Sequence, residues 1–325
     1  MSAVVAELQS TLKLLSDPVR LRLCGLLSRA ELAVQELCAV TGLAQSRTSN
    51  QLSRLKRTGL VRDRREGTWS FHSLVEPSEA GPLTPELFEA VLRPFLDSPE
   101  SRSDTKALAA VLEQRRRRSR EAHDRLAERW VEVGQDFVVG SLRAELLALA
   151  WPAGPVVADL GCGAGFLSGF LAQRGARVVA VDHSERMLAM AKRKAPARSI
   201  EFRRGELDAL PLREGEVDAA FSNLVWHHLP DAAAAAREVF RVLKPGGPLV
   251  VSDLEPHEAD WMRETMGDLR LGSKPDQVVG ALARAGFVDL RQEPALDRYR
   301  VTSPAGVTLE LPMFLVHGRK PARRR

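Results

Sequence analysis

The sequence is poor in cysteine and contains no long apolar run. Its three cysteines, Cys24, Cys38 and Cys162, are too few and too scattered for a disulfide framework or a zinc site. No stretch approaches the roughly 18 consecutive apolar residues that cross a bilayer, so no membrane partner is expected. The first residues also lack the basic segment and apolar run of a secretory signal. We therefore expect a cytoplasmic protein without a bound metal.

Positive charge is concentrated in one part of the chain. A length of 325 residues favours two domains over a single core. The formal net charge is +5, yet residues 20–72 alone contain ten Arg and Lys against four Asp and Glu, a net of +6. Such a local excess is typical of a surface that contacts nucleic acid, although a solvated basic face has the same composition.

A helix-turn-helix pattern lies within this basic region. A short helix is predicted to turn at Gly42, and the next helix starts near Ser46, whose side chain can cap it. Thr48, Leu52 and Leu55 recur at i, i+4 and i+7 and define an inward face. The opposite face carries Arg, Ser and Asn side chains, which suit phosphates and base edges in a major groove.

Two short strands follow the second helix, around a turn at Glu66 and Gly67. Arg64 and Arg65 stand near the tip of this hairpin, where a wing would meet the DNA backbone or the minor groove. The predicted DNA-contacting residues are Gln45, Ser46, Arg47, Ser49, Asn50, Arg54, Arg64 and Arg65.

Residues 12–75 resemble the ArsR family of bacterial winged-helix repressors. The family's opening helix is similar to LKLLSDPVRLRLCGLL, and its recognition helix and wing are similar to QSRTSNQLSRLKRTGLVRDRREGTWSFHSL. The resemblance implies a homodimer on a pseudo-palindromic, double-stranded DNA operator. Arsenic-sensing members carry a cysteine pair where this chain has Ala33 and Gln35, so metalloid sensing there is not expected.

The second half of the chain alternates strands and helices, which predicts a parallel sheet. Its first strand, in VVADLGCGAGF, runs into a glycine-rich turn, Asp159-x-Gly161-x-Gly163-x-Gly165. Glycines allow a tight turn and the close approach of a ligand. A pyrophosphate-binding turn has the spacing G-x-G-x-x-G, and Phe166 stands where its third glycine would be. The spacing therefore favours a ligand without phosphate over NAD.

Polar residues end the next three strands of this predicted sheet. Asp182 ends RVVAVD and is placed to accept two ribose hydroxyls. Glu206 follows the third strand, where an acidic group and a neighbouring N–H can meet an adenine edge. Asn223 ends the fourth strand, just before His227 and His228.

Residues 156–320 resemble class I S-adenosylmethionine-dependent methyltransferases, including an LKPGG turn at 243–247 and an AGF segment at 285–287. The resemblance implies a Rossmann-like domain whose seven-stranded sheet ends in an antiparallel strand, ELPMFLVHGRK. It assigns the methionine end of the cofactor to the glycine-rich turn and the floor near the sulfur to Asn223. The cofactor-binding residues that it implies are Asp159, Gly161, Cys162, Gly163, Gly165, Asp182, His183, Met187, Glu206, Leu207 and Asn223. The family more often has aspartate at the position of Glu206.

His227 and His228 are the candidate catalytic residues. In methyl transfer from a sulfonium the cofactor carries the activation, and the protein mainly positions the acceptor. A histidine here could deprotonate an acceptor hydroxyl, but a pair at this place also occurs in the family as packing. Residues 257–272, with Trp261 and Met266, suit either a partly apolar lid or an amphipathic surface helix.

The sequence predicts an α/β chain of three regions: a winged helix-turn-helix domain at 1–80, a linker with connecting helices at 81–150, and a methyltransferase domain at 151–325. DNA amino-methylation is not expected, because SNLVWHHL is not an Asn/Asp-Pro-Pro-aromatic run. Arsenite methylation is not expected either, because Cys162 is the single cysteine of that domain.

The expected function is that of a DNA-binding transcriptional regulator whose second domain uses S-adenosylmethionine to methylate a small molecule. An alternative stays open, in which the methyltransferase fold only senses S-adenosylmethionine or S-adenosylhomocysteine and thereby controls DNA binding.

Overall fold

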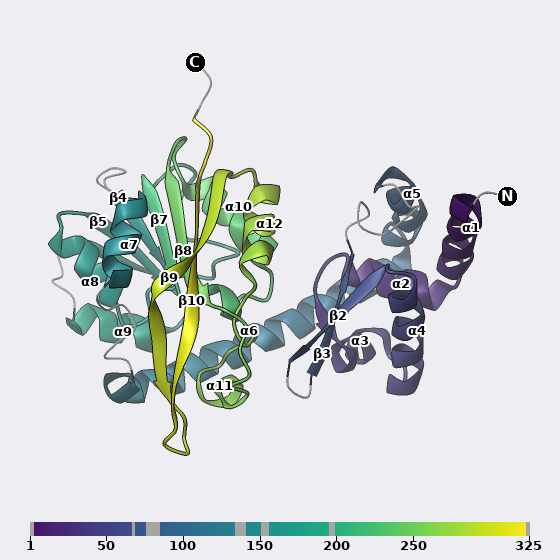
Figure 1. Ribbon diagram of the computed structural model, residues 1–325, viewed down its shortest axis with the longest axis horizontal. Helices are drawn as coiled ribbons and strands as arrows, with labels where there is room; N and C mark the ends of the chain where they lie inside the picture. The colour runs from purple at the N-terminus through teal and green to yellow at the C-terminus, as the bar shows by residue number, and fades with distance from the viewer. Residues whose placement is uncertain are drawn as a thin grey trace. The chain divides into compact units, whose positions relative to one another are not determined.

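The computed structural model of the chain describes residues 3–66, 69–75, 85–133, 141–150, 156–194 and 199–322. These residues form two compact units, 1–116 and 117–325, which divide within helix α6 (Pro99–Val133) (Figure 1). Every helix within the described ranges is too short or too polar to cross a membrane.

The first unit is a bundle of short helices with a small antiparallel sheet. Besides the first part of α6, its helices are α1 (Ala3–Leu15), α2 (Pro18–Leu27), α3 (Val34–Thr41), α4 (Gln45–Arg57) and α5 (Pro85–Leu96). Its strands are β1 (Leu32–Ala33), β2 (Val61–Glu66) and β3 (Trp69–Leu74), in the order β1-β3-β2. The hairpin β2–β3 is the predicted wing.

Local sequence signals set the ends of α2, α3 and α4. The Asp17 carboxylate accepts hydrogen bonds from the first backbone N–H groups of α2, and α3 ends at Gly42 in the left-handed conformation, with φ 72°. The prediction that Ser46 caps α4 is wrong. The N-cap is Ala44, which makes no side-chain cap bond, and Ser46 lies exposed in the first helical turn.

Leucines from six helices form the core of the first unit. Leu52 and Leu55 of α4 are buried together with Thr48, as their spacing predicts. Helix α5 adds Phe88, and the first part of α6 adds Leu108. The inward face of α4 is therefore fixed, and its opposite face is left to solvent.

The second unit contains a seven-stranded sheet with the order β6-β5-β4-β7-β8-β10-β9. Its strands are β4 (Val156–Leu160), β5 (Arg177–Asp182), β6 (Ile200–Arg204), β7 (Ala219–Asn223), β8 (Pro248–Leu254), β9 (Val288–Thr302) and β10 (Thr308–Arg319). Strands β4 to β8 pair in parallel, and β10 runs antiparallel to both of its neighbours. The expected Rossmann-like sheet with a closing antiparallel strand is confirmed.

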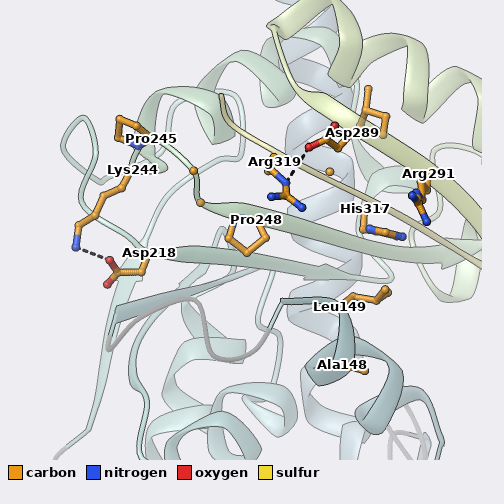
Figure 2. Close-up of a pocket in the computed structure, with 14 residues that line it drawn as sticks. Ala148, Leu149, Asp218, Lys244, Pro245, Pro248, Asp289, Arg291, His317 and Arg319 are labelled. Carbon is orange, nitrogen blue, oxygen red and sulfur yellow. Dashed lines mark hydrogen bonds and ion pairs between the residues drawn. The ribbon is translucent and has the colours of Figure 1, made fainter. Parts of the chain in front are cut away.

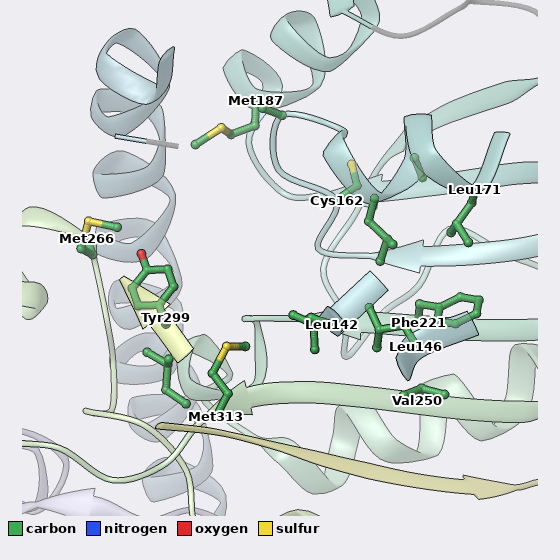
Figure 3. Packing of buried hydrophobic residues seen from close by; sticks show 14 of the residues in the cluster. Leu142, Leu146, Cys162, Leu171, Met187, Phe221, Val250, Met266, Tyr299 and Met313 are labelled. Atoms are coloured by element: carbon green, nitrogen blue, oxygen red, sulfur yellow. The ribbon is translucent and has the colours of Figure 1, made fainter. Parts of the chain in front are cut away.

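Helices cover both faces of this sheet. They are α7 (Ser141–Ala150), α8 (Phe166–Gln173), α9 (Glu185–Lys194), α10 (Ala232–Val242), α11 (Trp261–Thr265) and α12 (Pro275–Ala285), with a 3-10 turn at Trp226–His228. Alternate residues of each strand enter opposite cores. In β8, Val250 belongs to the same buried cluster as Leu142 and Met187 (Figure 3), whereas Val251 belongs to the cluster that contains Val239 of α10.

The predicted cofactor-binding and catalytic residues lie at one edge of this sheet. Strands β6, β5, β4 and β7 are neighbours and parallel, so their carboxyl ends meet at the same edge. In open α/β sheets ligands bind outside these carboxyl ends.

Candidate functional site

The glycine-rich turn after β4 takes a backbone that other residues rarely adopt. Gly161, Gly163 and Gly165 have φ values of 76°, 50° and 81°. A Cβ atom on Gly161 would lie 2.4 Å from the Val225 side chain, and one on Gly165 would lie 2.9 Å from the Cβ of Ala191. A Cβ on Gly163 would meet nothing within 4 Å. The turn is therefore packed at its two ends and open in its middle.

Asp182 joins this turn to the end of β5. Its Oδ2 accepts a hydrogen bond of 2.8 Å from the backbone N–H of Gly163, and its Oδ1 accepts one of 2.8 Å from Ser184. A carboxylate has about four lone-pair positions, so two positions remain for further donors. The predicted ribose-binding residue is thus held in place by the backbone on both sides.

Asp159 is buried beneath the turn. Its side chain accepts a hydrogen bond from the hydroxyl of Ser168 on α8, and only 1% of the residue is exposed. Burial raises the pKa of Asp159 to about 7, although the Ser168 hydrogen bond opposes the shift. Its predicted contact with the amino group of a methionine moiety stays a prediction.

Glu206 lies just after β6, between the side chains of Arg120 and His183. Its carboxylate accepts a hydrogen bond of 2.5 Å from Arg120, and its other oxygen lies 3.4 Å from Nδ1 of His183. Burial alone would raise the pKa of Glu206, but His183 and Arg120 outweigh it and lower that pKa to about 2. The Glu206 side chain is therefore ionised and oriented.

Helix α6 contributes residues to this edge that the sequence did not single out. Besides Arg120, its Asp124 accepts a hydrogen bond of 2.5 Å from the Ser184 hydroxyl. The ring of His123 lies edge-on to His183, with ring centroids 5.0 Å apart. The three α6 residues are spaced i, i+3 and i+4, so they share one face of the helix. That spacing was the one available signal in the sequence.

His227 is almost completely buried, and the carboxylate of Asp253 holds its ring in place. Asp253, in β8, accepts a hydrogen bond of 2.9 Å from the backbone N–H of His227, and its Oδ1 lies 2.5 Å from Nδ1 of the ring. Burial lowers the pKa of His227, but Asp253 and Asp268 reverse the effect and raise it to about 8. Neither aspartate was predicted.

The neighbouring His228 faces a backbone oxygen instead. Its Nδ1 lies 3.2 Å from the carbonyl oxygen of Gly267. Burial lowers the pKa of His228, and the charge of His227 lowers it further. The two rings are 4.0 Å apart between centroids.

The remaining predicted residues line the same edge. Asn223, at the end of β7, accepts a hydrogen bond of 2.6 Å from Ser252, and the following Leu224 has a left-handed φ of 57°. Non-glycine residues in this conformation gather at functional sites. Cys162, Met187 and Leu207 are buried. Residues 257–272 form the short helix α11 and loops, with Met262 and Met266 buried.

A separate hollow of about 930 Å³ lies at the opposite edge, near the start of β8 (Figure 2). Two ion pairs line it. Lys244 lies 2.6 Å from the Asp218 carboxylate, and Arg319 lies 3.1 Å from the Asp289 carboxylate. None of the predicted site residues lines this hollow.

In the first unit, α4 presents its polar face to solvent. Side chains of the predicted set are exposed at Gln45, Ser46, Arg47, Asn50 and Arg54, and Ser49 is partly exposed. The last turn of α4 also carries Lys56 and Arg57. This face combines donors for phosphates with short polar side chains for base edges.

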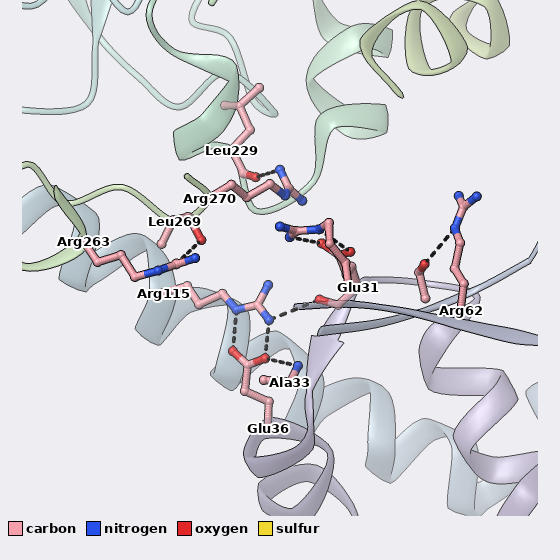
Figure 4. A network of polar contacts seen from close by, with 11 residues as sticks. Glu31, Ala33, Glu36, Arg62, Arg115, Leu229, Arg263, Leu269 and Arg270 are labelled. Carbon is pink, nitrogen blue, oxygen red and sulfur yellow. Dashed lines mark hydrogen bonds and ion pairs between the residues drawn. The ribbon is translucent and has the colours of Figure 1, made fainter. Parts of the chain in front are cut away.

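The two predicted wing arginines differ. Arg65 is exposed, whereas Arg64 pairs with Glu31 at 3.0 Å and lies over the Phe71 ring. Arg115 of α6 also binds the segment of Glu31. It donates hydrogen bonds to the Glu36 carboxylate and to the backbone oxygen of Glu31 (Figure 4). Arg64 therefore braces the wing.

Two family models match separate parts of the chain. Residues 17–63 match the model for bacterial regulatory proteins of the arsR family, and residues 158–251 match a methyltransferase domain.

Two of the curated relatives that the chain matches are named methyltransferases. An arsenite methyltransferase from Halobacterium salinarum is 30% identical over 206 residues, which are 58% of this chain and 52% of that protein. A demethylmenaquinone methyltransferase from Thermus thermophilus is 42% identical over 104 residues, 31% of this chain and 47% of that protein. The chain thus spans about half the length of these relatives.

One solved structure shares the fold of the second unit. A chain of the complex between the Haloferax volcanii Trm112 methyltransferase activator and a methyltransferase superposes with a TM-score of 0.52 at 20% identity. The match covers 63% of this chain and 99% of that one.

Proposed function

Because the chain carries an ArsR-family helix-turn-helix domain and a methyltransferase domain, we propose that it is a DNA-binding regulator whose second domain binds S-adenosylmethionine and methylates a small molecule. One arrangement carries the proposal. The carboxylate of Asp182 ties the open glycine turn at Gly163 to the end of β5, next to the ionised Glu206.

The residues at this edge fit an adenosyl compound. A ligand can approach the backbone at Gly163, where a Cβ would meet open space. The free lone pairs of Asp182 suit two ribose hydroxyls, and the segment at Glu206 and Leu207 would hold the adenine. When bound, S-adenosylmethionine supplies a methyl group that is already activated on a sulfonium.

The protein's own contribution to the reaction is the placement of the acceptor. The Asp253 carboxylate and the Gly267 carbonyl fix the rings of His227 and His228, which follow β7 at the same edge. We infer that the acceptor lies against this pair, on the side where Asn223 ends β7.

An arsenite acceptor is disfavoured by the state of the cysteines. One relative is named an arsenite methyltransferase, but the three cysteines of this chain include only Cys162 in the second unit. That residue is buried, and burial raises the pKa of its thiol, which opposes the thiolate form that binds soft elements. The proposed acceptor is therefore a small molecule of another class.

DNA binding is assigned to the exposed face of α4 in a homodimer on a double-stranded operator. Arg47 and Arg54 would contact phosphates, and Ser49 and Asn50 the base edges. Arg65 would reach the backbone from the wing.

A sensor function is the second candidate, and helix α6 favours it. Within the first unit, Asp104 of α6 accepts two hydrogen bonds from Arg22. Within the second unit, Arg120 of the same helix bonds Glu206. A ligand that shifts these contacts would bias DNA affinity only through different binding to the two states of the regulator.

Calorimetry with the full chain tests the cofactor assignment. We expect S-adenosylmethionine and S-adenosylhomocysteine to bind one per chain, and Asp182→Ala to abolish both, because the ribose loses its acceptor. Asp276→Ala, at an exposed position of α12, is the control and should bind normally. Unchanged affinity in Asp182→Ala would refute the assignment.

Operator gel shifts with and without each ligand, together with turnover of the cofactor in cell extract, separate the two functions. Turnover supports the enzyme. Product-preferring binding that alters DNA affinity, without turnover, supports the sensor.

A further inference from the structure

Four of the seven histidines in the chain form one continuous group at the cofactor edge. The ring of His123 contacts His183 on one side and His228 on the other, with centroids 5.0 Å and 4.5 Å apart. His228 in turn contacts His227. A general base requires one histidine. Proton abstraction alone therefore does not explain why His227 and His228 lie side by side.

The two histidines of the pair are oriented in the same way. Nδ1 of His227 lies 2.5 Å from the Asp253 carboxylate, and Nδ1 of His228 lies 3.2 Å from the Gly267 carbonyl oxygen. Both partners only accept, so each Nδ1 carries the proton. In the neutral form of each ring, which is the form that binds a metal, Nε2 then presents a bare lone pair. Metal-ligating histidines are oriented in this manner by a carboxylate or a backbone carbonyl.

Both Nε2 atoms face the same carboxylate oxygen. Oδ1 of Asp268 lies 3.7 Å from Nε2 of His227 and 3.8 Å from Nε2 of His228. These distances exceed those of hydrogen bonds. Metal–ligand bonds of about 2.0–2.2 Å in a tetrahedral arrangement separate two ligand atoms by roughly 3.4 Å. The two distances to Asp268 are thus a few tenths of an ångström longer than a bound cation requires.

The surroundings of Asp268 also call for positive charge. The residue is 4% exposed, and its Oδ2 has no hydrogen-bond partner among the residues that the structure describes. The carboxylate of Asp253, completely buried, lies on the far side of His227. Two buried carboxylates and two converging lone pairs are costly unless a cation or ion pair compensates them.

We propose that His227, His228 and Asp268 bind one divalent transition-metal ion of the Zn²⁺ class. The three ligand atoms lie within 4.8 Å of one another. Two imidazoles and one carboxylate suit Zn²⁺, Co²⁺ or Fe²⁺, whereas Mg²⁺ and Ca²⁺ take oxygen ligands. Asp253 and the Gly267 carbonyl are the outer partners that orient the two rings.

Three protein ligands leave a coordination position open. This position suits an oxygen of the methyl acceptor, an assignment that rests on the proposed function, whereas the metal site itself does not. The ligand role replaces the role of proton acceptor, because both need the same Nε2 lone pair of His227.

Metal binding to the full chain tests the proposal directly. The protein is dialysed against a chelator, freed of it, and titrated with Zn²⁺ alone in a calorimeter and with Co²⁺ alone in a visible spectrometer. We expect one ion per chain, strong tetrahedral Co²⁺ absorption bands, and no competition from Mg²⁺. Asp268→Asn and His228→Gln should each weaken Zn²⁺ binding by roughly 100-fold, and Asp253→Asn by about 10-fold or more.

His317→Gln is the matched control. The His317 ring on β10 also lies 3.7 Å from a carboxylate, that of Glu293, but among the described residues it belongs to no group of three metal-ligating side chains. Its loss should leave Zn²⁺ affinity unchanged. Equal Zn²⁺ affinity of Asp268→Asn and the wild type, or a wild-type chain that binds no Zn²⁺, would overturn the proposal.

Two further readouts keep the outcome clear. Thermal melting of the metal-free variants identifies any variant that fails to fold. The Co²⁺ spectrum of the wild type then distinguishes a tetrahedral site with histidine ligands from a Co²⁺ ion that stays hydrated in solution. S-adenosylhomocysteine binding measured in chelator tests the proposed cofactor site separately, so either proposal can fail without the other.

Discussion

Arg120 and Glu206 form an ion pair of 2.5 Å that joins helix α6 to the segment after β6. The pair is partly shielded, with side-chain exposures of 23% and 29%. Its effect is to hold an acidic side chain in one orientation at the edge where an adenine is expected.

Loss of this arginine should weaken cofactor binding. In Arg120→Met the Glu206 carboxylate loses its closest donor. A hydrogen bond to a charged group contributes about 1.5–3 kcal/mol, and the partial exposure of this pair reduces the contribution. We therefore expect S-adenosylhomocysteine to bind about 5-fold to 10-fold more weakly. Calorimetry measures the change. Arg117→Met is the control on the same helix, because Arg117 is exposed and its ion pair with Glu121 runs along α6. Equal losses in both variants would contradict the role of Arg120.

The turn at Gly161 should tolerate no side chain. Gly161→Ala combines a left-handed backbone with a Cβ only 2.4 Å from Val225, so the turn must move. We expect a lower melting temperature and loss of S-adenosylhomocysteine binding. Gly215→Ala has the same sign of φ but meets open space. It should lower stability by only about 1–2 kcal/mol and leave binding intact.

DNA affinity should depend on Arg54 through phosphate contact. Gel shifts with the operator at several salt concentrations should show weaker binding for Arg54→Ala and a salt slope smaller by about 1. Arg93→Ala, at an exposed position of α5, serves as the comparison in the same unit. An unchanged titration for Arg54→Ala would remove this residue from the interface.

Acid stability should depend on Glu216. The hydrogen bond from Arg203, at 2.7 Å, lowers the pKa of Glu216 from 4.5 to about 2. A lowered pKa in the folded state means that the stabilisation is complete above pH 4.5 and is lost as the pH falls toward 2.

Glu216→Gln should therefore melt at a lower temperature than the wild type at pH 5 and above, and the difference should shrink as the pH approaches 2. Glu264→Gln, exposed on α11, should show no such convergence. A constant difference across this pH range would contradict the assignment to the Glu216 carboxylate.

Residues that act through local sequence were predictable from it. The i, i+4, i+7 spacing of Thr48, Leu52 and Leu55 gave the buried face of α4, and the position of Asp182 at the end of a strand gave its place beside the glycine turn. In both cases the backbone period or the strand end fixes where a side chain goes.

Residues that depend on distant segments were not predictable in the same way. Asp253 and Asp268 meet His227 only because β8 lies beside β7 and because a loop returns to this edge. The expectation of a metal-free protein was drawn from the cysteines, and it stays a prediction that the Zn²⁺ titration tests.

Two expectations about the first unit show where local reasoning ends. A serine near a helix start favours a cap, yet the chain enters α4 so soon after the left-handed Gly42 that Ala44 takes the cap position. Arg64 has the charge expected at a wing and its DNA contact stays a prediction, but local sequence did not reveal its ion pair with Glu31. An ion pair between residues far apart in the sequence cannot be predicted from the residues next to either partner.

The contact between Gly165 and Ala191 has a consequence for sequence variation. Helices α8 and α9 approach so closely here that a Cβ at residue 165 would be 2.9 Å from the alanine methyl group. Enlarging either residue narrows the room left for the other. Homologous chains should therefore keep the pair small together, and a bulky residue at either position should mark a lineage in which the two helices have moved apart and the adjoining turn has been rebuilt.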